Sequence, residues 1–95
     1  MPFKHGMRPY TKEDVLKLNP NQNGVYGIFR NSAAIYVGSG DIRERVLAHL
    51  NGDNPCITRN TPNLWTAELV SGDPSKREAE LIQEYRPECN KVLPR

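Results

Sequence analysis

Glu78 is the residue whose position most needs a chemical explanation. The segment from Pro74 to Tyr85 has the 3.6-residue period of a helix, with Asp73 placed as its cap. Glu78 falls in the middle of the apolar stripe of this helix, next to Leu81. A carboxylate on a buried face is costly unless it is paired or holds a cation. We therefore expect Glu78 to have a partner.

Arg45 and His49 form a second candidate pair, because residues four positions apart lie one above the other on a helix. Asp41 is placed to cap this helix, and its apolar stripe runs from Ile42 to Leu50. Both polar side chains project to the border of that stripe. The helix therefore presents one permanently charged and one titratable side chain at the edge of its buried face.

Tyr26 and Tyr36 lie in two strand-like segments, residues 24–30 and 33–38, which a short polar turn joins. Both segments are rich in β-branched and aromatic residues, which predicts a hairpin. Because side chains alternate along a strand, each strand carries one phenol at a fixed place. The glycines in and beside these segments leave room for another backbone or a ligand to approach closely.

The remaining segments supply the elements that must hold these groups in place. Residues 1–10 are expected to be an irregular arm, and Thr11 is expected to begin a short helix. Residues 51–63 are rich in Asn, Pro, Gly and Thr, which predicts a long loop that is mobile or used for binding. Residues 64–70 alternate like a third strand, with Trp65 expected in the core. This order predicts an α+β fold, in which helices pack on a three-stranded, mainly antiparallel sheet.

The composition is that of one ordinary globular domain. The 95 residues are 37% hydrophobic and 25% charged, which excludes a disordered chain. No apolar run approaches the length needed to cross a bilayer, and the first residues lack the apolar core of a signal peptide. We therefore expect a cytoplasmic protein with no membrane partner. The net charge of +2 is too small to indicate nucleic acid by itself, although basic residues gather in the first segment.

The two cysteines, Cys56 and Cys89, are far apart and show no Cys-x-x-Cys spacing. Because no secretion signal is present, we expect two reduced thiols rather than a disulfide. His5 and His49 are the two histidines, and they form no cluster of suitable ligands, so we reject a zinc site.

Taken together, the motifs resemble those of the GIY-YIG nuclease family. The two tripeptides that name the family match Gly24-Val25-Tyr26 and Tyr36-Val37-Gly38, each with one substituted position. The family has an arginine and often a histidine on the next helix, a glutamate on a later helix, and an asparagine after the proline that ends that helix. These positions are matched by Arg45, His49, Glu78 and Asn90. The resemblance covers nearly all of residues 23–90 and extends to the amino-terminal incision module of the bacterial excision-repair nuclease and to homing endonucleases.

The resemblance implies a GIY-YIG nuclease-like domain over residues 23–95, preceded by an arm and a short helix over residues 1–22. It implies a metal-dependent endonuclease that hydrolyses DNA phosphodiester bonds in repair or recombination. Glu78 would hold a single Mg²⁺ or Mn²⁺ ion, and Arg45 would brace the scissile phosphate. Tyr26 would accept a proton from the attacking water once the metal or the arginine lowers its pKa.

The resemblance gives supporting roles to further residues. Tyr36 and His49 would position water or phosphate, with His49 as an alternative base. Ser39, Arg43 and Asn90 are candidate substrate contacts, and Asn90 would also orient the last helix or the site. The turn before the arginine is one residue shorter than is usual in the family, which leaves Arg43 as a competitor for the phosphate-bracing role.

Each candidate also has a plain structural explanation. Tyr26 and Tyr36 fit half-buried strand tyrosines, and Glu78 fits a first-turn carboxylate favoured by the helix dipole. Arg45 and His49 fit ordinary neighbours on a helix surface, and Asn90 fits a cap after Pro87. For the whole chain, one alternative is a non-cleaving nucleic-acid-binding module of the same fold. Another is a nuclease subunit active only with a separate targeting protein or through self-association, and a third is a structural domain that binds no DNA.

Overall fold

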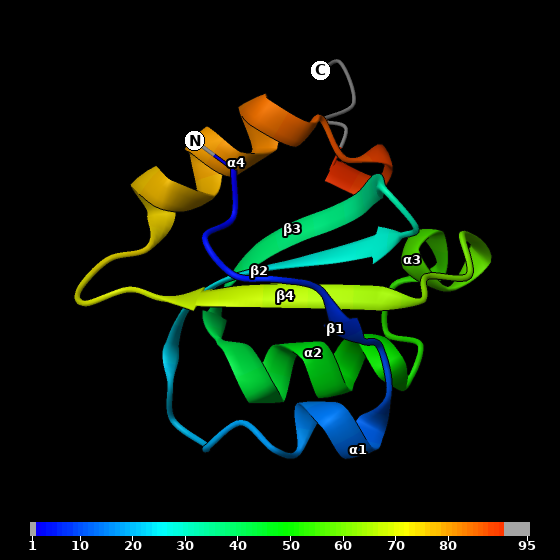
Figure 1. Cartoon of the computed structure of the whole chain (residues 1–95), viewed down its shortest axis with the longest axis horizontal. Helices are drawn as coiled ribbons and strands as arrows, with labels where there is room; N and C mark the ends of the chain where they lie inside the picture. The colour runs from blue at the N-terminus through cyan, green and yellow to red at the C-terminus, as the bar shows by residue number, and fades with distance from the viewer. Residues whose placement is uncertain (1, 91–95) are drawn as a thin grey trace.

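An antiparallel sheet of four strands forms the centre of the computed structural model, which describes residues 2–90 (Figure 1). The strand order is β1-β4-β2-β3. In chain order the strands are β1 (Arg8–Pro9), β2 (Asn23–Arg30), β3 (Ala33–Asp41) and β4 (Leu64–Leu69). The helices are α1 (Lys12–Val15), α2 (Ile42–Leu50), α3 (Pro55–Arg59), α4 (Ser75–Tyr85) and the short 3₁₀ helix η1 (Glu88–Asn90).

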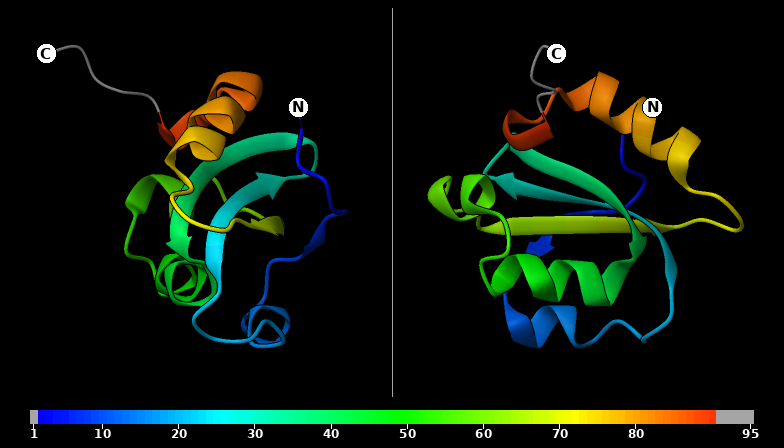
Figure 2. Two further views of the ribbon diagram at one scale, coloured as in Figure 1. Left: turned by 90° about the vertical axis from the view of Figure 1, so that its left-hand side faces the viewer. Right: turned by 180° about the vertical axis from the view of Figure 1, so that it is seen from behind.

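Helices cover both faces of the sheet, with α1 and α2 on one side and α4 on the other (Figures 1 and 2). The predicted α+β fold is therefore confirmed. The strand count is corrected, because the described part of the chain forms four strands rather than three. The additional strand, β1, lies inside the segment expected to be an irregular arm, and it pairs Arg8 with Trp65 and Pro9 with Leu64. Two residues are too few to show an alternating pattern, and a proline is tolerated at a sheet edge.

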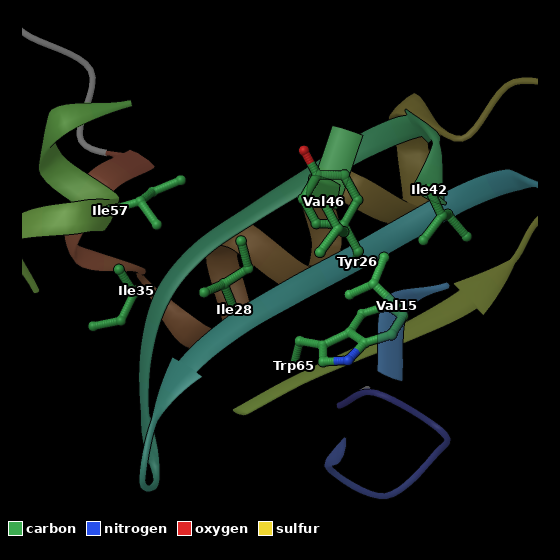
Figure 3. Packing of buried hydrophobic residues seen from close by; sticks show 8 residues of the cluster. All are labelled: Val15, Tyr26, Ile28, Ile35, Ile42, Val46, Ile57 and Trp65. Atoms are coloured by element: carbon green, nitrogen blue, oxygen red, sulfur yellow. The ribbon is translucent and has the colours of Figure 1, made fainter. Parts of the chain in front are cut away.

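Alternation along β2 divides the core into two clusters. Tyr26 and Ile28 face α2, whereas Val25 packs with Val37 and Leu81 on the α4 side. The larger cluster, drawn in Figure 3, comprises Val15, Tyr26, Ile28, Ile35, Ile42, Val46, Ile57 and Trp65. Trp65 is fully buried, as expected.

Residues from the segment 1–22, predicted to be an arm followed by a short helix, contribute to both clusters. Val15 is part of the larger cluster, and Phe3 packs against the smaller one. The division of the chain at residue 22 stays a prediction. Within residues 2–90, no helix combines the length and the apolar character that crossing a bilayer requires.

Helix starts follow the predicted caps in two cases out of three. Thr11 accepts a hydrogen bond from the backbone of Asp14, and Asp41 caps α2 through the backbone of Glu44. At α4 the prediction is one residue early. Helix α4 begins at Ser75, whose backbone and hydroxyl both donate to Asp73, so this carboxylate forms a turn before the helix rather than its cap. Helix α3 lies inside the predicted loop over residues 51–63.

A disulfide joins Cys56 on α3 to Cys89 on η1, with the two Cα atoms 5.7 Å apart. The expectation of two reduced thiols is therefore wrong. The cysteines are 33 residues apart in the chain, and the packing of α3 beside η1 brings them together. Sequence spacing alone does not reveal a contact of this range.

Candidate functional site

A chain of hydrogen bonds links a strand tyrosine to a loop carboxylate through His49. The Oη atom of Tyr26 on β2 lies 2.7 Å from Nε2 of His49 on α2. On the other side of the ring, Nδ1 of His49 lies 2.8 Å from Oδ1 of Asp53. Because a carboxylate only accepts hydrogen bonds, Nδ1 carries the proton, and Nε2 accepts from the Tyr26 hydroxyl.

The imidazole of His49 is buried, with only 3% of the residue exposed. Burial lowers the pKa of His49, although Asp53 partly opposes this shift. The ring is therefore neutral near pH 7, which agrees with one nitrogen donating and the other accepting. A buried neutral imidazole with a hydroxyl on its free nitrogen can take up a proton from that hydroxyl.

Tyr36 on β3 completes an aromatic cluster with these two side chains. The strand register places Tyr36 opposite Ile28 and Tyr26 opposite Gly38, so both phenols lie on the face of α2. The Tyr36 ring centroid lies 5.1 Å from that of His49 and 6.2 Å from that of Tyr26. Burial, and then the charge of Glu78, raise the pKa of Tyr36. This phenol is therefore protonated at neutral pH.

The pKa of Tyr26 is also raised, chiefly by burial and then by Tyr36, while Arg45 opposes the rise. The expectation that arginine would lower this pKa holds for the direction of its effect but not for the net shift. Tyr26 is therefore a neutral phenol, and it can accept a second proton only as it passes its own to His49. Figure 3 shows its hydroxyl pointing away from Trp65 and Val15.

Arg45 on α2 lies beside this cluster and remains accessible, with 43% of its side chain exposed. Its Nη2 atom lies 3.8 Å from Oδ2 of Asp53. The adjacent Tyr26 hydroxyl, and more weakly Asp53, raise the pKa of Arg45. A permanently charged guanidinium thus stands at the solvent side of the two phenols, where a phosphate could reach it.

Arg43 does not join this cluster. Two residues along a helix turn by about 200°, so its side chain leaves α2 in another direction from that of Arg45. It lines a separate hollow with Pro20, Asn21, Asp41, Glu44 and Leu47. The geometry therefore favours Arg45 as the arginine beside the tyrosines.

Glu78 on α4 has the partner that its position in the apolar stripe required. The hydroxyl of Ser39 on β3 donates to its Oε1 at 2.9 Å. Ser39 pairs with Val25 in the strand register and so lies on the α4 face, opposite to the tyrosines. Since β3 is at the edge of the sheet, the carboxylate and the phenols lie on the two faces beside that edge, close enough for the charge of Glu78 to raise the pKa of Tyr36.

The donor set at Glu78 suits a hydrated ion rather than a cage of protein ligands. Among residues 2–90, no group of three or more His, Cys, Asp or Glu side chains could hold a metal. Other inward carboxylates are paired: Asp14 accepts from Trp65 and Arg8, and Glu68 accepts from Arg77. Glu78, by contrast, has no ion pair within the described residues and accepts from a hydroxyl. Mg²⁺ is commonly bound through one or two carboxylates plus waters and phosphate oxygens, and Glu78 fits this mode.

Glycines in both tripeptides are required by close packing. A side chain at Gly38 would collide with the hydroxyl and ring of Tyr26, which crosses over this residue. A side chain at Gly24 would collide with the backbone carbonyl of Glu68 on the neighbouring strand. The phenol on β2 can therefore reach His49 only because the opposite residue on β3 has no side chain.

Asn90 on η1 binds the edge strand through both ends of its amide. Its Oδ1 accepts from the backbone nitrogen of Val37 at 2.7 Å, and its Nδ2 donates to the Val37 carbonyl at 2.9 Å. The amide thus continues the sheet for one residue beside Tyr36. This arrangement supports the expected orienting role more than a direct contact with substrate.

Asp53 is the site residue that the sequence analysis missed, because residues 51–63 were interpreted only as a loop. The chain leaves α2 through Gly52, which has a φ of +86°. The backbone nitrogens of Gly52 and Asp53 bond to the carbonyls of His49 and Ala48, which is the Schellman motif. This turn places Asp53 four residues after His49 and against its ring. A glycine just after the helix was the available signal.

The sequence matches no protein-family model and no curated protein. Its fold is similar to solved structures of the GIY-YIG N-terminal endonuclease domain of UvrC from Thermotoga maritima. That domain bound to its catalytic divalent cation, magnesium, is 27% identical with a TM-score of 0.71, over 85% of this chain and 100% of that one. A variant with an asparagine replaced by alanine is 26% identical with a TM-score of 0.71, over 87% and 100% of the two chains.

A tyrosine-to-phenylalanine variant of the same domain is 26% identical, with a TM-score of 0.71, over 86% of this chain and 100% of that one. The likeness therefore includes the whole of the UvrC domain and most of the present chain. The motifs, the sheet topology and this likeness agree: the chain has the fold of the GIY-YIG endonuclease domain, which supports its resemblance to that family.

Proposed function

We propose that the protein is a metal-dependent endonuclease that hydrolyses phosphodiester bonds in DNA. The observation that carries this proposal is the hydrogen bond from Tyr26 to His49 beside the accessible guanidinium of Arg45. The arrangement offers a proton acceptor next to an anion-binding group, as hydrolysis of a phosphodiester requires. The similar UvrC domain, an endonuclease domain with a catalytic magnesium ion, supports the same reaction class.

Tyr26 and His49 act together in the proton transfer. The attacking water gives a proton to Oη of Tyr26 as that hydroxyl gives its own proton to Nε2 of His49, 2.7 Å away. The oxygen of the water forms a bond to phosphorus, the bond from phosphorus to the leaving oxygen breaks, and that oxygen takes a proton from solvent. The relay removes the need for a phenolate, which the raised pKa of Tyr26 disfavours.

Arg45 and Tyr36 hold the phosphate, and Ser39 positions Glu78. The guanidinium of Arg45 has a forked set of donors that matches two phosphate oxygens, and its charge offsets the charge that develops on them. Tyr36 is half-buried beside His49, so its hydroxyl can orient water or phosphate at the open side of the cluster. Ser39 keeps the carboxylate of Glu78 turned toward the edge of β3.

Glu78 is the residue that would hold the Mg²⁺ or Mn²⁺ ion. A divalent ion in this position supplies Lewis-acid stabilisation of the phosphate and of the leaving oxygen. The half-buried carboxylate, with a hydroxyl on one oxygen, leaves acceptor positions for a hydrated cation.

The test is cleavage of supercoiled plasmid, single-stranded and branched oligonucleotides with Mg²⁺ or Mn²⁺, and with EDTA as the metal-free control. We expect cleavage by the wild type, and loss of at least about 100-fold in Glu78→Ala and Arg45→Ala. Arg43→Ala is the matched control, because it removes the same charge from the same helix outside the tyrosine cluster. Cleavage that persists unchanged in Glu78→Ala would rule the proposal out.

The small size and low net charge of the molecule favour a partner that helps it to select its DNA target. It measures 36 × 29 × 23 Å and carries a net charge of +2. Its longest dimension therefore spans about one turn of duplex DNA, roughly 34 Å. We infer weak DNA binding by the isolated domain, with a targeting protein or a second copy supplying further contacts. We expect the logarithm of the DNA-binding constant to fall only gradually with the logarithm of salt concentration, with the slope of a protein that contacts only a few phosphates.

A further inference from the structure

We propose that Asp53 is a positioning residue for the proton relay, holding His49 in the tautomer and orientation in which Nε2 faces Tyr26. This inference rests on the proposed nuclease function for its consequence, but its structural part can be measured without cleavage. It concerns a residue on the loop after α2 that belongs to neither tripeptide.

The backbone fixes Asp53 against the ring of His49. Gly52 adopts its positive φ of +86°, and the two Schellman bonds end α2 in a defined turn. The Asp53 carboxylate, 36% exposed, then places Oδ1 at 2.8 Å from Nδ1 of His49 and Oδ2 at 3.8 Å from Nη2 of Arg45. One carboxylate therefore contacts the proton acceptor and the phosphate-binding group together.

The groups that face His49 leave Asp53 as the acceptor for its Nδ1 proton. Tyr26 from β2 donates to Nε2, and Tyr36 from β3 packs edge-on against the ring. Tyr10, before α1, has a hydroxyl with no hydrogen-bond partner among the described residues, and burial followed by the charge of Asp53 raises its pKa to about 12. Tyr10 is therefore neutral, and the fixed charges near the ring are those of Asp53 and Arg45.

The carboxylate affects the relay in two ways. It keeps the proton on Nδ1, so that the lone pair of Nε2 is directed at the Tyr26 hydroxyl. It also stabilises the imidazolium that forms when His49 takes the proton, which the buried position of the ring otherwise disfavours. Carboxylates that orient metal-binding histidines in this way contribute about 10- to 100-fold to activity, and we expect an effect of the same order here.

The experiment compares the wild type with Asp53→Ala, Asp53→Glu and Glu44→Ala. Glu44→Ala is the matched control, since Glu44 is an exposed acid on α2 that lines the hollow of Arg43. We expect Asp53→Ala to lower single-turnover cleavage by about 10- to 100-fold. Asp53→Glu, which keeps the charge and the acceptor, restores most of that loss. Melting temperatures confirm that each variant is folded.

Two readouts separate positioning from a general loss of structure. In Asp53→Ala the acid limb of the pH–rate profile shifts to lower pH, because Asp53 raises the pKa of His49 and its removal lowers that pKa further. The ¹⁵N chemical shifts of His49, measured in the protein without DNA, report the tautomer of the ring. Nδ1 is protonated in the wild type, and the Nε2-protonated form grows in Asp53→Ala.

Failure of this inference is distinguishable from failure of the nuclease assignment. If the wild type cuts, Glu78→Ala does not, and Asp53→Ala keeps the wild-type rate or the wild-type ¹⁵N shifts, the role of Asp53 is overturned and the nuclease stands. If no variant cuts under any metal condition, the nuclease assignment fails, and the ¹⁵N shifts alone decide whether Asp53 sets the tautomer.

Discussion

Removal of the Tyr26 hydroxyl tests the central hydrogen bond of the site. Tyr26→Phe deletes one oxygen and keeps the ring, which is part of the larger core cluster. The oxygen is 2.7 Å from Nε2 of His49, and the tyrosine is 1% exposed. Its loss leaves a buried nitrogen without its donor, which costs about 2 kcal/mol of unfolding free energy. For a domain of this size, that corresponds to a fall of roughly 8–16 °C in melting temperature.

The effect on cleavage is expected to exceed the effect on stability. In the proposed mechanism the phenol passes the proton from the attacking water to His49. Its absence would therefore remove a general acid–base step, which contributes about 100- to 10,000-fold. Single-turnover cleavage of a labelled oligonucleotide at a temperature where both proteins are folded measures this loss. Calorimetry or circular dichroism on the same samples gives the melting temperatures.

Tyr85→Phe is the matched control for this substitution. The Tyr85 hydroxyl accepts a hydrogen bond from the backbone of Phe3 at 3.1 Å on the α4 side of the sheet. Its removal should cost about 1 kcal/mol and leave cleavage unchanged. The reasoning is refuted if Tyr26→Phe cuts within about twofold of the wild type while Glu78→Ala is inactive, since acid–base participation predicts a far larger loss.

Three further substitutions or treatments test other contacts. Gly38→Ala should lower the free energy of unfolding by about 1–3 kcal/mol and abolish cleavage, because the new methyl group displaces the phenol of Tyr26 on β2. Urea unfolding measures the first effect, and the cleavage assay measures the second. Reduction of the Cys56–Cys89 disulfide, which closes a loop of 33 residues, should lower the free energy of unfolding by about 3–4 kcal/mol. Urea unfolding with dithiothreitol, compared with unfolding without it, measures this difference. Arg77 holds the pKa of Glu68 below its ordinary value. The ionised carboxylate therefore stabilises the fold at pH values above the ordinary pKa, and this contribution is lost as the pH falls through the lowered pKa. The free energy of unfolding of Glu68→Gln, measured by urea unfolding across the acid range, should therefore depend less on pH than that of the wild type.

Local patterns were sufficient to predict where several side chains of the candidate site lie. The four-residue step from Arg45 to His49 needed only the helical period, and the interior stripe of α4 identified Glu78 as a carboxylate in need of a partner. Alternation along the two strands gave each phenol a defined face. These features depend on neighbours within a turn or a strand, which the sequence displays directly.

Features that depend on distant packing were not predictable in this way. The choice between Arg43 and Arg45 required the rotation of α2 on the sheet, and the identity of Ser39 as the partner of Glu78 required the approach of α4 to β3. The disulfide joins segments 33 residues apart, and β1 is too short to have a period. Asp53 was the intermediate case, since its position follows from a local turn whose glycine is visible in the sequence.

The position of β3 at the border of the sheet constrains how copies of this protein can assemble. An unpaired strand normally invites addition of another strand along its free backbone. Here such pairing would compete with the amide of Asn90 for Val37 and would cover the stretch between the phenols and Glu78. A dimer built by strand addition at β3 would therefore be a self-inhibited form, and an assembly that cuts both strands of a duplex must join its subunits through other surfaces.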